Sequence, residues 1–414
     1  MALGGAGATF WMIVCGLLGM ATKFAECTMG VKYRTQHEDG SFSGGPFKYM
    51  PVAFGRLFGK WPALVLTGIF AVAIFGFGVG GGNMFQANQT YVQAREVTGG
   101  EDGFLGSDGA SLIFGLILAG LVAAVILGGI KSIGRVTSTL VPFMGIFYVV
   151  ACLFVILSNI GHVPAAFQSI IEGAFTPQAG LGGLVGVLIV GFQRAAFSNE
   201  AGLGSAPNVA AVAEVKHPAA QGIVQSLSVF IDTLILCSCT ALIILLSGVY
   251  QPGMEQAGVV LTQSAVAAVV GEWGRVFVSL ALLLFVFTTL IYNYYLGENA
   301  LGFFSQKRGP VMIYRVLVVG LVLWGSVQDL GTVFAFADVT MGLLAICNLI
   351  ALALLFKVGL RLMRDYDSQI KAGVESPVLD AKQFADLDLD PAVWGNQPSS
   401  AADPAEIGDR AYQR

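Results

Sequence analysis

Long apolar segments dominate the chain, and short polar segments separate them. A helix that crosses the hydrocarbon core of a bilayer needs about 20 mostly apolar residues. Nine segments meet this requirement, near residues 7–31, 63–90, 110–130, 139–160, 181–213, 222–248, 273–297, 311–328 and 333–357. The pattern therefore predicts an all-α polytopic membrane protein with nine spans.

The fifth of these segments is too long for one straight helix and is polar where a spanning helix is apolar. Its small and polar residues include Ser198, Asn199, Glu200, Gly202, Gly204 and Pro207. We expect the helix to break here, which frees backbone groups that need partners inside lipid. A cation together with a zwitterionic substrate would supply such partners. The alternative is a kinked helix whose role is packing alone.

The N-terminal end of the half-helix after this break, near Ala206 and Pro207, would present amides and a positive dipole to a carboxylate. Glu200 inside the break needs a proton, a basic partner or a bound cation. Arg194 lies within reach of the broken segment, so we expect it to pair with Glu200 or with Glu26.

A second candidate site lies in the glycine-rich stretch 77–88. Four glycines in this stretch leave one helix face bare. Asn83 and Gln86 are three residues apart and share a face. The amide of Gln86 both donates and accepts, which suits the carboxylate or the ammonium group of an amino acid. The alternative is a glycine packing seam in which Gln86 bonds to a neighbouring helix.

Thr288 and Thr289, near the middle of the seventh span, are candidate ligands of a sodium ion. Their hydroxyl groups are hard, neutral oxygen ligands, but threonine also bonds to its own helix. Asn293 lies about one turn further on and is a further candidate for substrate binding.

Asp232 is a lone carboxylate at the centre of the sixth span. It either holds the break in place or joins the coupling path. Lys23 and Glu26 form an i, i+3 pair that we interpret as structural. Asp338 and Asn348, in the ninth span, receive no assignment from the sequence.

The distribution of charge predicts an orientation and a separate tail. Lysine and arginine concentrate in the loops after odd-numbered spans, which places the C-terminus in the cytoplasm and Met1 outside. From residue 365 onward the chain has ten acidic and four basic residues together with several prolines. We therefore expect a membrane domain at 1–364 and an acidic, mostly disordered cytoplasmic tail at 365–414.

Composition narrows the function further. The chain is 55% hydrophobic and 12% charged, with 54 glycines, which fits helices packed closely in lipid. A net charge of −4 and the lack of a basic tract argue against nucleic-acid binding. The six cysteines lie in apolar runs and are expected to be packing residues. With no enzyme or nucleotide-binding motif in the sequence, gradient-driven transport fits better than a channel or a membrane enzyme, and no obligate protein partner is evident.

Several motifs resemble the alanine or glycine:cation symporter family. The longest is FSNEAGLGSAP at 197–207. Matching stretches run in order from residue 4 to about 370, at 19–27, 44–46, 82–88, 128–136, 229–234, 293–298 and 348–352.

The resemblance implies a LeuT-type fold, with two inverted repeats of five helices and broken first and sixth helices. It also implies uptake of alanine, glycine or a similar small amino acid by alternating access, coupled to Na⁺ or H⁺, in a bacterial plasma membrane and without a cofactor. Gln86 would contact the substrate, residues 198–204 would line the pocket, and Thr288 and Thr289 would hold sodium.

The same resemblance implies that the nine spans are helices 2–10 of that fold. The family's first helix leads into a glycine-rich stretch like the one at 3–8, where this chain begins. The sequence is therefore expected to be a truncated form that is inactive by itself. A non-transporting sensor or remnant that keeps the fold is the alternative.

Overall fold

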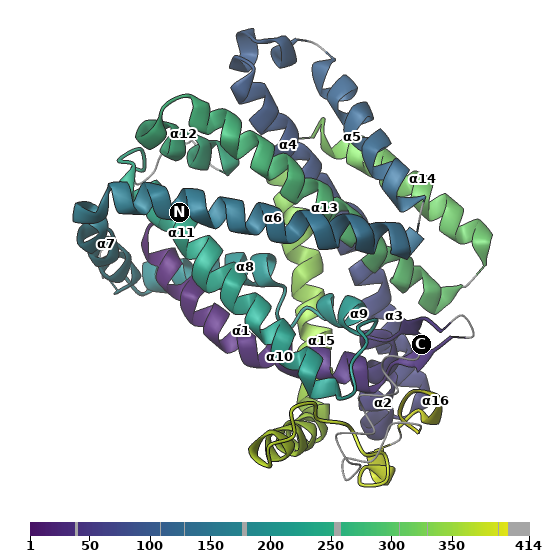
Figure 1. Ribbon diagram of the computed structural model, residues 1–414. Coiled ribbons are helices and arrows are strands. Elements are labelled where there is room, and N and C mark those ends of the chain that lie inside the picture. The colour runs from purple at the N-terminus through teal and green to yellow at the C-terminus, as the bar shows by residue number, and fades with distance from the viewer. Residues whose placement is uncertain are drawn as a thin grey trace. The chain divides into compact units, whose positions relative to one another are not determined.

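The computed structural model describes residues 1–37, 40–107, 109–127, 129–175, 180–251, 258–305, 307–328, 330–387 and 389–395. Helices make up nearly all of the described chain (Figure 1). The strands β1 (Thr35–Gln36) and β2 (Phe42–Ser43) pair antiparallel, with Thr35 opposite Ser43. The all-α class predicted from the apolar pattern is confirmed.

Each of the nine predicted segments contains helix. The first four correspond to α1 (Gly7–Lys32), to α3 (Lys60–Gly76) with η1 (Phe77–Gly82) and α4 (Asn83–Val97), to α5 (Ala110–Ile126), and to α6 (Gly129–Ser158). The fifth and sixth correspond to α8 (Gly180–Asn199) with α9 (Ala206–Ala210), and to α10 (Pro218–Val229) with η6 (Phe230–Cys237) and α11 (Ser238–Leu246). The last three correspond to α13 (Trp273–Phe304), α14 (Arg308–Gly325) and α15 (Leu330–Lys371).

The sequence did not predict three further helices, which are α2 (Pro46–Phe58), α7 (Val163–Phe175) and α12 (Val259–Val270). Each has 12 or 13 residues, fewer than a spanning helix needs. Short 3₁₀ helices lie at η2 (Gly100–Asp102), η3 (Phe104–Gly106), η4 (Ile160–His162) and η7 (Ala385–Leu387), and the last short helix is α16 (Pro391–Trp394). The segments η1 and η6 are π-helices.

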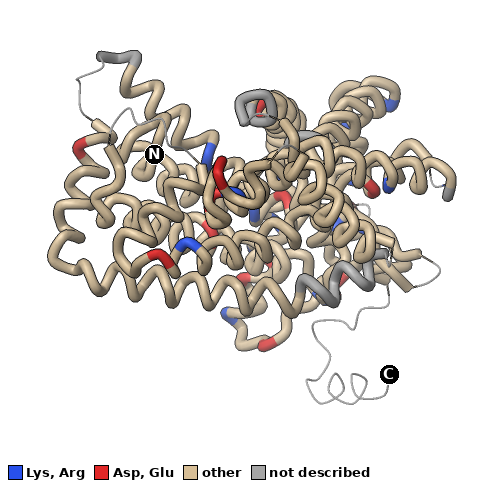
Figure 2. Tube along the Cα trace, turned by 90° about the horizontal axis from the view of Figure 1, so that it is seen from above, with Lys and Arg blue, Asp and Glu red and all other residues tan. Residues whose placement is uncertain are grey.

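Five helical segments of the described chain are long and apolar enough to cross a membrane. They are Gly7–Lys32, Ser138–Ser158, Pro218–Leu246, Trp273–Phe304 and Ala335–Lys371. The apolar helices at Lys60–Gly76, Ala110–Ile126, Gly183–Asn199 and Gly309–Gly325, in the other four predicted segments, are shorter. Most residues along these helices are uncharged (Figure 2), and the charged residues of the last segment, apart from Asp338, lie between Lys357 and Lys371.

Helix α5 shows why lipid is the expected solvent. Its buried face includes Leu118 and Val122, whereas Ile113 and Ile117 on the other face are each 61% exposed. A helix that is apolar on both faces would leave a large apolar surface in water, which soluble proteins avoid.

The chain divides into two compact units. Unit 1 comprises residues 1–16, 71–198 and 231–343, and unit 2 comprises residues 17–70, 199–230 and 344–414. The divisions at 16/17, 70/71 and 343/344 fall within α1, α3 and α15. Each unit is described by itself.

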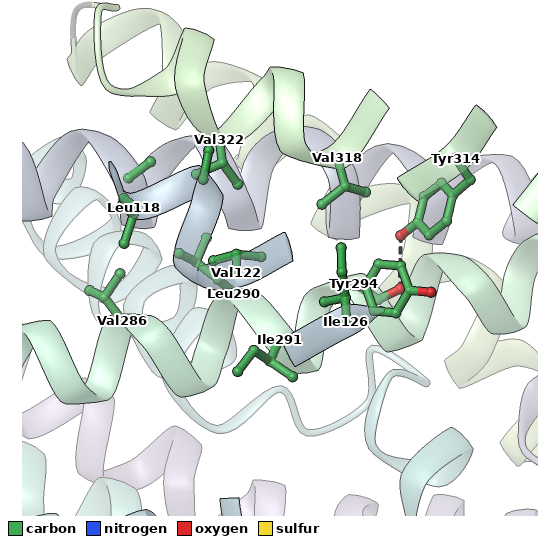
Figure 3. Close-up of a cluster of buried hydrophobic side chains, with 12 residues drawn as sticks. Leu118, Val122, Ile126, Val286, Leu290, Ile291, Tyr294, Tyr314, Val318 and Val322 are labelled. Carbon is green, nitrogen blue, oxygen red and sulfur yellow. Dashed lines mark hydrogen bonds between the residues drawn. The ribbon is translucent and has the colours of Figure 1, made fainter. Parts of the chain in front are cut away.

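In unit 1, α13 packs against α4, α6 and α12, and α14 packs against α5 and α4. Side chains of α4, α5, α13 and α14 form an apolar cluster (Figure 3), whose buried members include Ala87, Leu118, Val122, Leu290, Ile291, Tyr294, Tyr314 and Val318. The Tyr314 hydroxyl donates to the backbone oxygen of Tyr294 at 2.8 Å, and the two rings stack with centroids 5.4 Å apart. The hydrogen bond satisfies the polar end of a tyrosine that is otherwise in an apolar core.

In unit 2, the loop after α9 is held by Arg34, which follows α1. The Arg34 guanidinium donates to the backbone oxygens of Ala213 at 2.5 Å and Val215 at 3.2 Å. Burial lowers the pKa of Arg34 to about 10, and Glu214 opposes the shift. An arginine stays protonated at neutral pH even with this pKa, so it remains a donor to the loop.

His217 ends the same loop and caps α10. Its Nδ1 accepts from the backbone N–H of Ala219 at 3.1 Å, so Nε2 carries the proton and donates to Asp365 Oδ2 at 3.1 Å. Burial lowers the pKa of His217, while Asp365 acts in the opposite direction. The neutral imidazole satisfies both partners at once, which links α10 to α15.

The sequence predicts disorder from residue 365 onward, but the structure has residues 365–387 and 389–395 in an ordered segment. Helix α15 continues to Lys371, and the following segment packs on unit 2 through buried Leu379, Phe384 and Trp394. The Leu379 N–H donates to Lys216 O at 3.1 Å. The Trp394 indole N–H donates to Lys32 O at 3.2 Å. A few apolar side chains with satisfied backbone bonds are enough to order an acidic segment, and residues 396–414 lie outside the described residues.

We expect Trp394→Ala to release the C-terminal segment. Trp394 is 1% exposed, and truncating a buried tryptophan costs about 3–5 kcal/mol. Cleavage of the purified protein by trypsin after the exposed Lys382 should then accelerate roughly 100-fold, because cleavage tracks the population of the open form. Mass spectrometry of the fragments measures the rate.

Trp61→Ala is the control for this experiment, because Trp61 is in the same unit and 80% exposed. Equal cleavage rates in Trp394→Ala and the unmodified protein would contradict the packing described for this segment.

Candidate functional site

The helix predicted to break does so between α8 and α9. Helix α8 ends at Asn199 and α9 begins at Ala206. Glu200, Gly202 and Gly204 have φ values of 53°, 85° and 76°, which lie in the left-handed region that interrupts an α-helix. Glycine adopts this region without strain. Glu200 is the one non-glycine residue among the described residues that does so.

Local side chains satisfy part of the backbone that the break sets free. Asn199 Oδ1 accepts from the N–H of Ala201 at 2.9 Å. Asn208 Nδ2 donates to the backbone oxygens of Gly204 at 2.9 Å and Ser205 at 3.0 Å. The Ser205 hydroxyl donates to the carboxylate of Glu200. Glu200 therefore has a protein partner within the break itself.

Side chains from distant parts of unit 2 satisfy three more backbone groups. Lys23 Nζ donates to Asn199 O at 2.8 Å. Asn348 Nδ2 donates to Gly202 O at 3.0 Å. The Gly204 N–H donates to Glu26 Oε2 at 3.1 Å. The expectation that a cation and a substrate supply the partners of the break is therefore not met for these three groups, because the protein supplies them.

These side chains belong to one buried group of four residues, Lys23, Glu26, Tyr49 and Asn348, here called the Glu26 cluster. Each is at most 4% exposed. Asn348 Nδ2 also donates to Glu26 Oε2 at 2.9 Å, and the Tyr49 hydroxyl donates to Asn348 Oδ1 at 2.5 Å. Lys23 Nζ lies 3.8 Å from Glu26 Oε1. The two buried charges thus compensate each other, as buried charges must.

The sequence did not assign most of this cluster. The sequence predicts only a structural pair for Lys23 and Glu26, and it assigns no role to Asn348 or Tyr49. A polar residue within an apolar span is a functional candidate by default, which flagged Asn348. Its partners lie 146 to 322 residues away in the chain, so spacing alone gave no means to find them.

In unit 1, Asp232 contacts the last turn of α8. The Ser198 hydroxyl donates to Asp232 Oδ2 at 2.7 Å and lies 3.2 Å from Cys237 Sγ. The Thr233 hydroxyl donates to the same Asp232 oxygen at 3.0 Å. Asp232 lies in the π-helix η6, a conformation that often marks functional positions. Of the two roles left open for Asp232, this geometry favours holding the end of α8.

Arg194 pairs with a residue that the sequence left unassigned. Arg194 Nη2 donates to both carboxylate oxygens of Asp338, at 2.8 and 3.0 Å. The two side chains are 29% and 31% exposed. The structure therefore gives Asp338 a partner on α8. The sequence predicts that Arg194 pairs with Glu200 or Glu26, but the basic residue beside Glu26 is Lys23.

The glycines before α4 leave room for α13. A Cβ atom on Gly82 would lie 2.4 Å from Asn293 Nδ2, and one on Gly78 would lie 2.7 Å from Asn293 O. Asn83 and Asn293 are 0% and 2% exposed. Asn83 Oδ1, Asn83 Nδ2 and Asn293 Oδ1 are buried without a hydrogen-bond partner. The glycines therefore allow α13 to approach closely. The buried side-chain amides of Asn83 and Asn293 retain unused hydrogen-bonding capacity.

Gln86 is half-buried on α4, one turn after Asn83. Its neighbour Phe85 packs edge-on against Phe197 of α8, with ring centroids 5.3 Å apart. Thr288 and Thr289 both donate to Phe285 O at 2.9 Å. Because these bonds use the hydroxyl hydrogens, the oxygen lone pairs remain available to a cation.

Each unit contains a cavity. One cavity in unit 1 has a volume of about 320 Å³ and is lined by residues that include Thr9, Arg194, Cys237 and Thr240; another, of about 350 Å³, has an apolar lining that includes Phe147 and Phe277. Both volumes are at the lower end for small-molecule sites. The cavity in unit 2 has about 640 Å³ and an apolar lining that includes Phe24, Leu227, Phe356 and Met363, which suits an acyl chain better than an amino acid.

The chain matches a known protein family and resembles several known proteins in sequence. A family model described as the sodium:alanine symporter family matches residues 1–381. The chain is similar to the amino-acid carrier protein AlsT of Bacillus subtilis, at 38% identity over 94% of this chain and 79% of that protein.

Two further relatives are named as sodium symporters. The probable sodium/glutamine symporter GlnT of Bacillus subtilis is 38% identical over 90% of this chain and 74% of its own length. The sodium/alanine symporter AgcS of Methanococcus maripaludis is 39% identical over 85% of this chain and 76% of its own length.

We expect Gly204→Ala to destabilise the break. An alanine here would have an unfavourable positive φ, and its Cβ would lie about 3 Å from side-chain atoms of Phe70, Asn348 and Pro46. These effects together cost about 2 kcal/mol or more, which should lower the midpoint of thermal unfolding in detergent by about 3 °C or more. Gly120→Ala is the matched control, because a Cβ at Gly120 meets nothing within 4 Å. An equal midpoint in the two variants would contradict the strained geometry of Gly204.

Proposed function

Because the chain belongs to the sodium:alanine symporter family, we propose that it couples the entry of Na⁺ to the uptake of a small amino acid. It is a multi-pass membrane protein of a transporter family and not an enzyme. In this proposal the free energy of the Na⁺ gradient drives accumulation of the substrate by alternating access between the two sides of the membrane.

The broken helix α8–α9 is the observation that carries this proposal. Transporters place substrate sites at interrupted helices, because such helices expose backbone groups and helix ends at membrane depth. Here six residues separate the end of α8 at Asn199 from the start of α9 at Ala206. It lies in a segment whose sequence predicted a substrate pocket.

The substrate contacts are assigned separately in each unit. In unit 1, Gln86 would bind the carboxylate or ammonium group of the substrate, and Asn83, Asn293 and Ser198 would add neutral polar contacts. The buried, unpartnered amide atoms of Asn83 and Asn293 support this assignment. In unit 2, Asn199, Gly202 and Gly204 would line the pocket at the break.

The coupling ion is assigned to Thr288 and Thr289, whose hydroxyl oxygens keep free lone pairs. Sodium is favoured over H⁺ because GlnT and AgcS are both named as sodium symporters. The same names include glutamine and alanine, so the substrate is proposed as a neutral amino acid with a small or polar side chain. Alanine is the first to test.

The remaining parts of the proposal concern architecture and location. We assign the nine apolar segments to helices 2–10 of a LeuT-type fold, in the plasma membrane of a bacterial cell. The C-terminus is assigned to the cytoplasm, because lysine and arginine concentrate in the loops on that side.

Transport in proteoliposomes tests the function. The assay uses the purified 414-residue chain. We expect an inward Na⁺ gradient to drive uptake of labelled alanine above its equilibrium level. Collapse of the gradient with a sodium ionophore should abolish accumulation. Uptake that is indifferent to Na⁺ would disprove sodium coupling, and binding of alanine without counterflow would favour a sensor.

Gln86→Ala tests the substrate contact. The loss of one hydrogen bond to a charged group, about 1.5 kcal/mol, should raise the KM for alanine roughly 10-fold. Gln168→Ala is the control, since Gln168 is an exposed glutamine on α7. An unchanged KM in Gln86→Ala would remove this residue from the site.

A further inference from the structure

The Glu26 cluster has a role that neither the motifs nor the relatives assign. We propose that Glu26, Asn348 and Tyr49 are positioning residues of the transport site, which hold the α8–α9 break in one conformation by binding its backbone. The proposal deepens the proposed function and rests on it.

The cluster contacts the break at three places along its length. Asn199 O at its start binds Lys23, Gly202 O in its middle binds Asn348, and Gly204 N–H near its end binds Glu26. All three contacts are to backbone atoms. They therefore set the path of the chain whatever side chains the break carries.

Asn348 joins the middle of the break to its end. Its Nδ2 has two hydrogens, and the structure uses both: one for Gly202 O at 3.0 Å and one for Glu26 Oε2 at 2.9 Å. Oε2 in turn accepts from Gly204 N–H. A single amide thus ties two residues of the break to the same carboxylate oxygen.

Tyr49 supports the orientation of this amide. The oxygen and nitrogen of an asparagine side chain have nearly the same shape, so only hydrogen-bond partners distinguish the two orientations. The Tyr49 hydroxyl donates to Asn348 Oδ1 at 2.5 Å, in the same orientation that Gly202 O, which can only accept, requires of Nδ2. With Oδ1 held in this way, Nδ2 must face Gly202 and Glu26.

Glu26 is the acceptor in this arrangement. Oε2 accepts from two donors, which an ionised carboxylate does best. Lys23 compensates the charge from 3.8 Å and also donates to Asn199 O. A side chain that is 0% exposed and bonded in this way is costly to move, so the cluster holds the break in place. Precise positions are what a binding site built from backbone groups requires.

Isosteric variants test the hydrogen bonds without changing the packing. Tyr49→Phe removes only the hydroxyl that orients Asn348. Asn348→Asp keeps the size and the acceptor but removes both donors and places a second acidic group beside Glu26. Tyr148→Phe is the matched control, because the Tyr148 hydroxyl also makes a part-buried bond, 2.8 Å to Thr240 Oγ1, far from the break in the sequence.

Two readouts are measured on the full chain in lipid nanodiscs and in proteoliposomes: hydrogen exchange of the amides in residues 201–205, and KM and kcat for alanine. We expect exchange at Gly204 to accelerate roughly 10-fold in Tyr49→Phe and more in Asn348→Asp, because each lost bond lowers the cost of local opening. KM should rise roughly 10-fold with a smaller change in kcat. Tyr148→Phe should leave both readouts unchanged.

The proposal is overturned if Tyr49→Phe matches the unmodified protein in both exchange and KM. A purely space-filling cluster would give that result. If Asn348→Asp does not insert into the membrane, Tyr49→Phe alone decides the question. If the unmodified protein shows no sodium-driven uptake, the proposed function fails, and the exchange measurement still decides whether the cluster positions the break.

Discussion

Backbone polar groups have no water to bind inside a bilayer, and this constraint organises the molecule. It explains why the chain is almost entirely helical, since a helix satisfies its own N–H and C=O groups. It also makes any interruption expensive, because each freed group must find a partner in the protein or in a ligand. The six-residue break after α8 is tolerated because unit 2 surrounds it with donors and acceptors. The buried charges of Lys23 and Glu26, costly in isolation, are placed where the break needs a strong donor and a strong acceptor.

Close approach of helices follows from the same setting. In lipid the hydrophobic effect does not drive helices together, so small residues that allow backbone contact become important. Gly30 packs on Pro207 of α9 in unit 2, where a Cβ would lie 2.7 Å from the proline ring. In unit 1, the missing side chain of Gly82 likewise leaves room for Asn293, whose Nδ2 would lie 2.4 Å from a Cβ at Gly82. The glycines thus place polar groups that would otherwise be kept apart by side chains.

The apolar pattern was enough to predict helix positions and the break, because both depend on residues that are neighbours in the chain. It missed α2, α7 and α12, which are too short to span a membrane, and it missed the π-helices η1 and η6. The partners of Asn348 and the pairing of Arg194 with Asp338 depend on contacts between distant segments, which periodicity does not report. The order of residues 365–395 was missed for another reason: composition describes the average of a segment, whereas Leu379 and Trp394 each fill a specific buried position.

Hydrogen-bonding capacity separates the groups that hold the fold from those that are free to meet a ligand. In the Glu26 cluster, both hydrogens of Asn348 Nδ2 are in use, and Glu26 Oε2 accepts two bonds. Asn83 and Asn293 are equally buried, yet three of their side-chain atoms have no partner. Leaving a buried polar atom unpaired costs about 1–3 kcal/mol, and the Glu26 cluster itself has one such atom, Glu26 Oε1. The unpaired amides are therefore the part of unit 1 that our proposal assigns to the substrate, whereas in unit 2 the protein itself binds three backbone groups of the break.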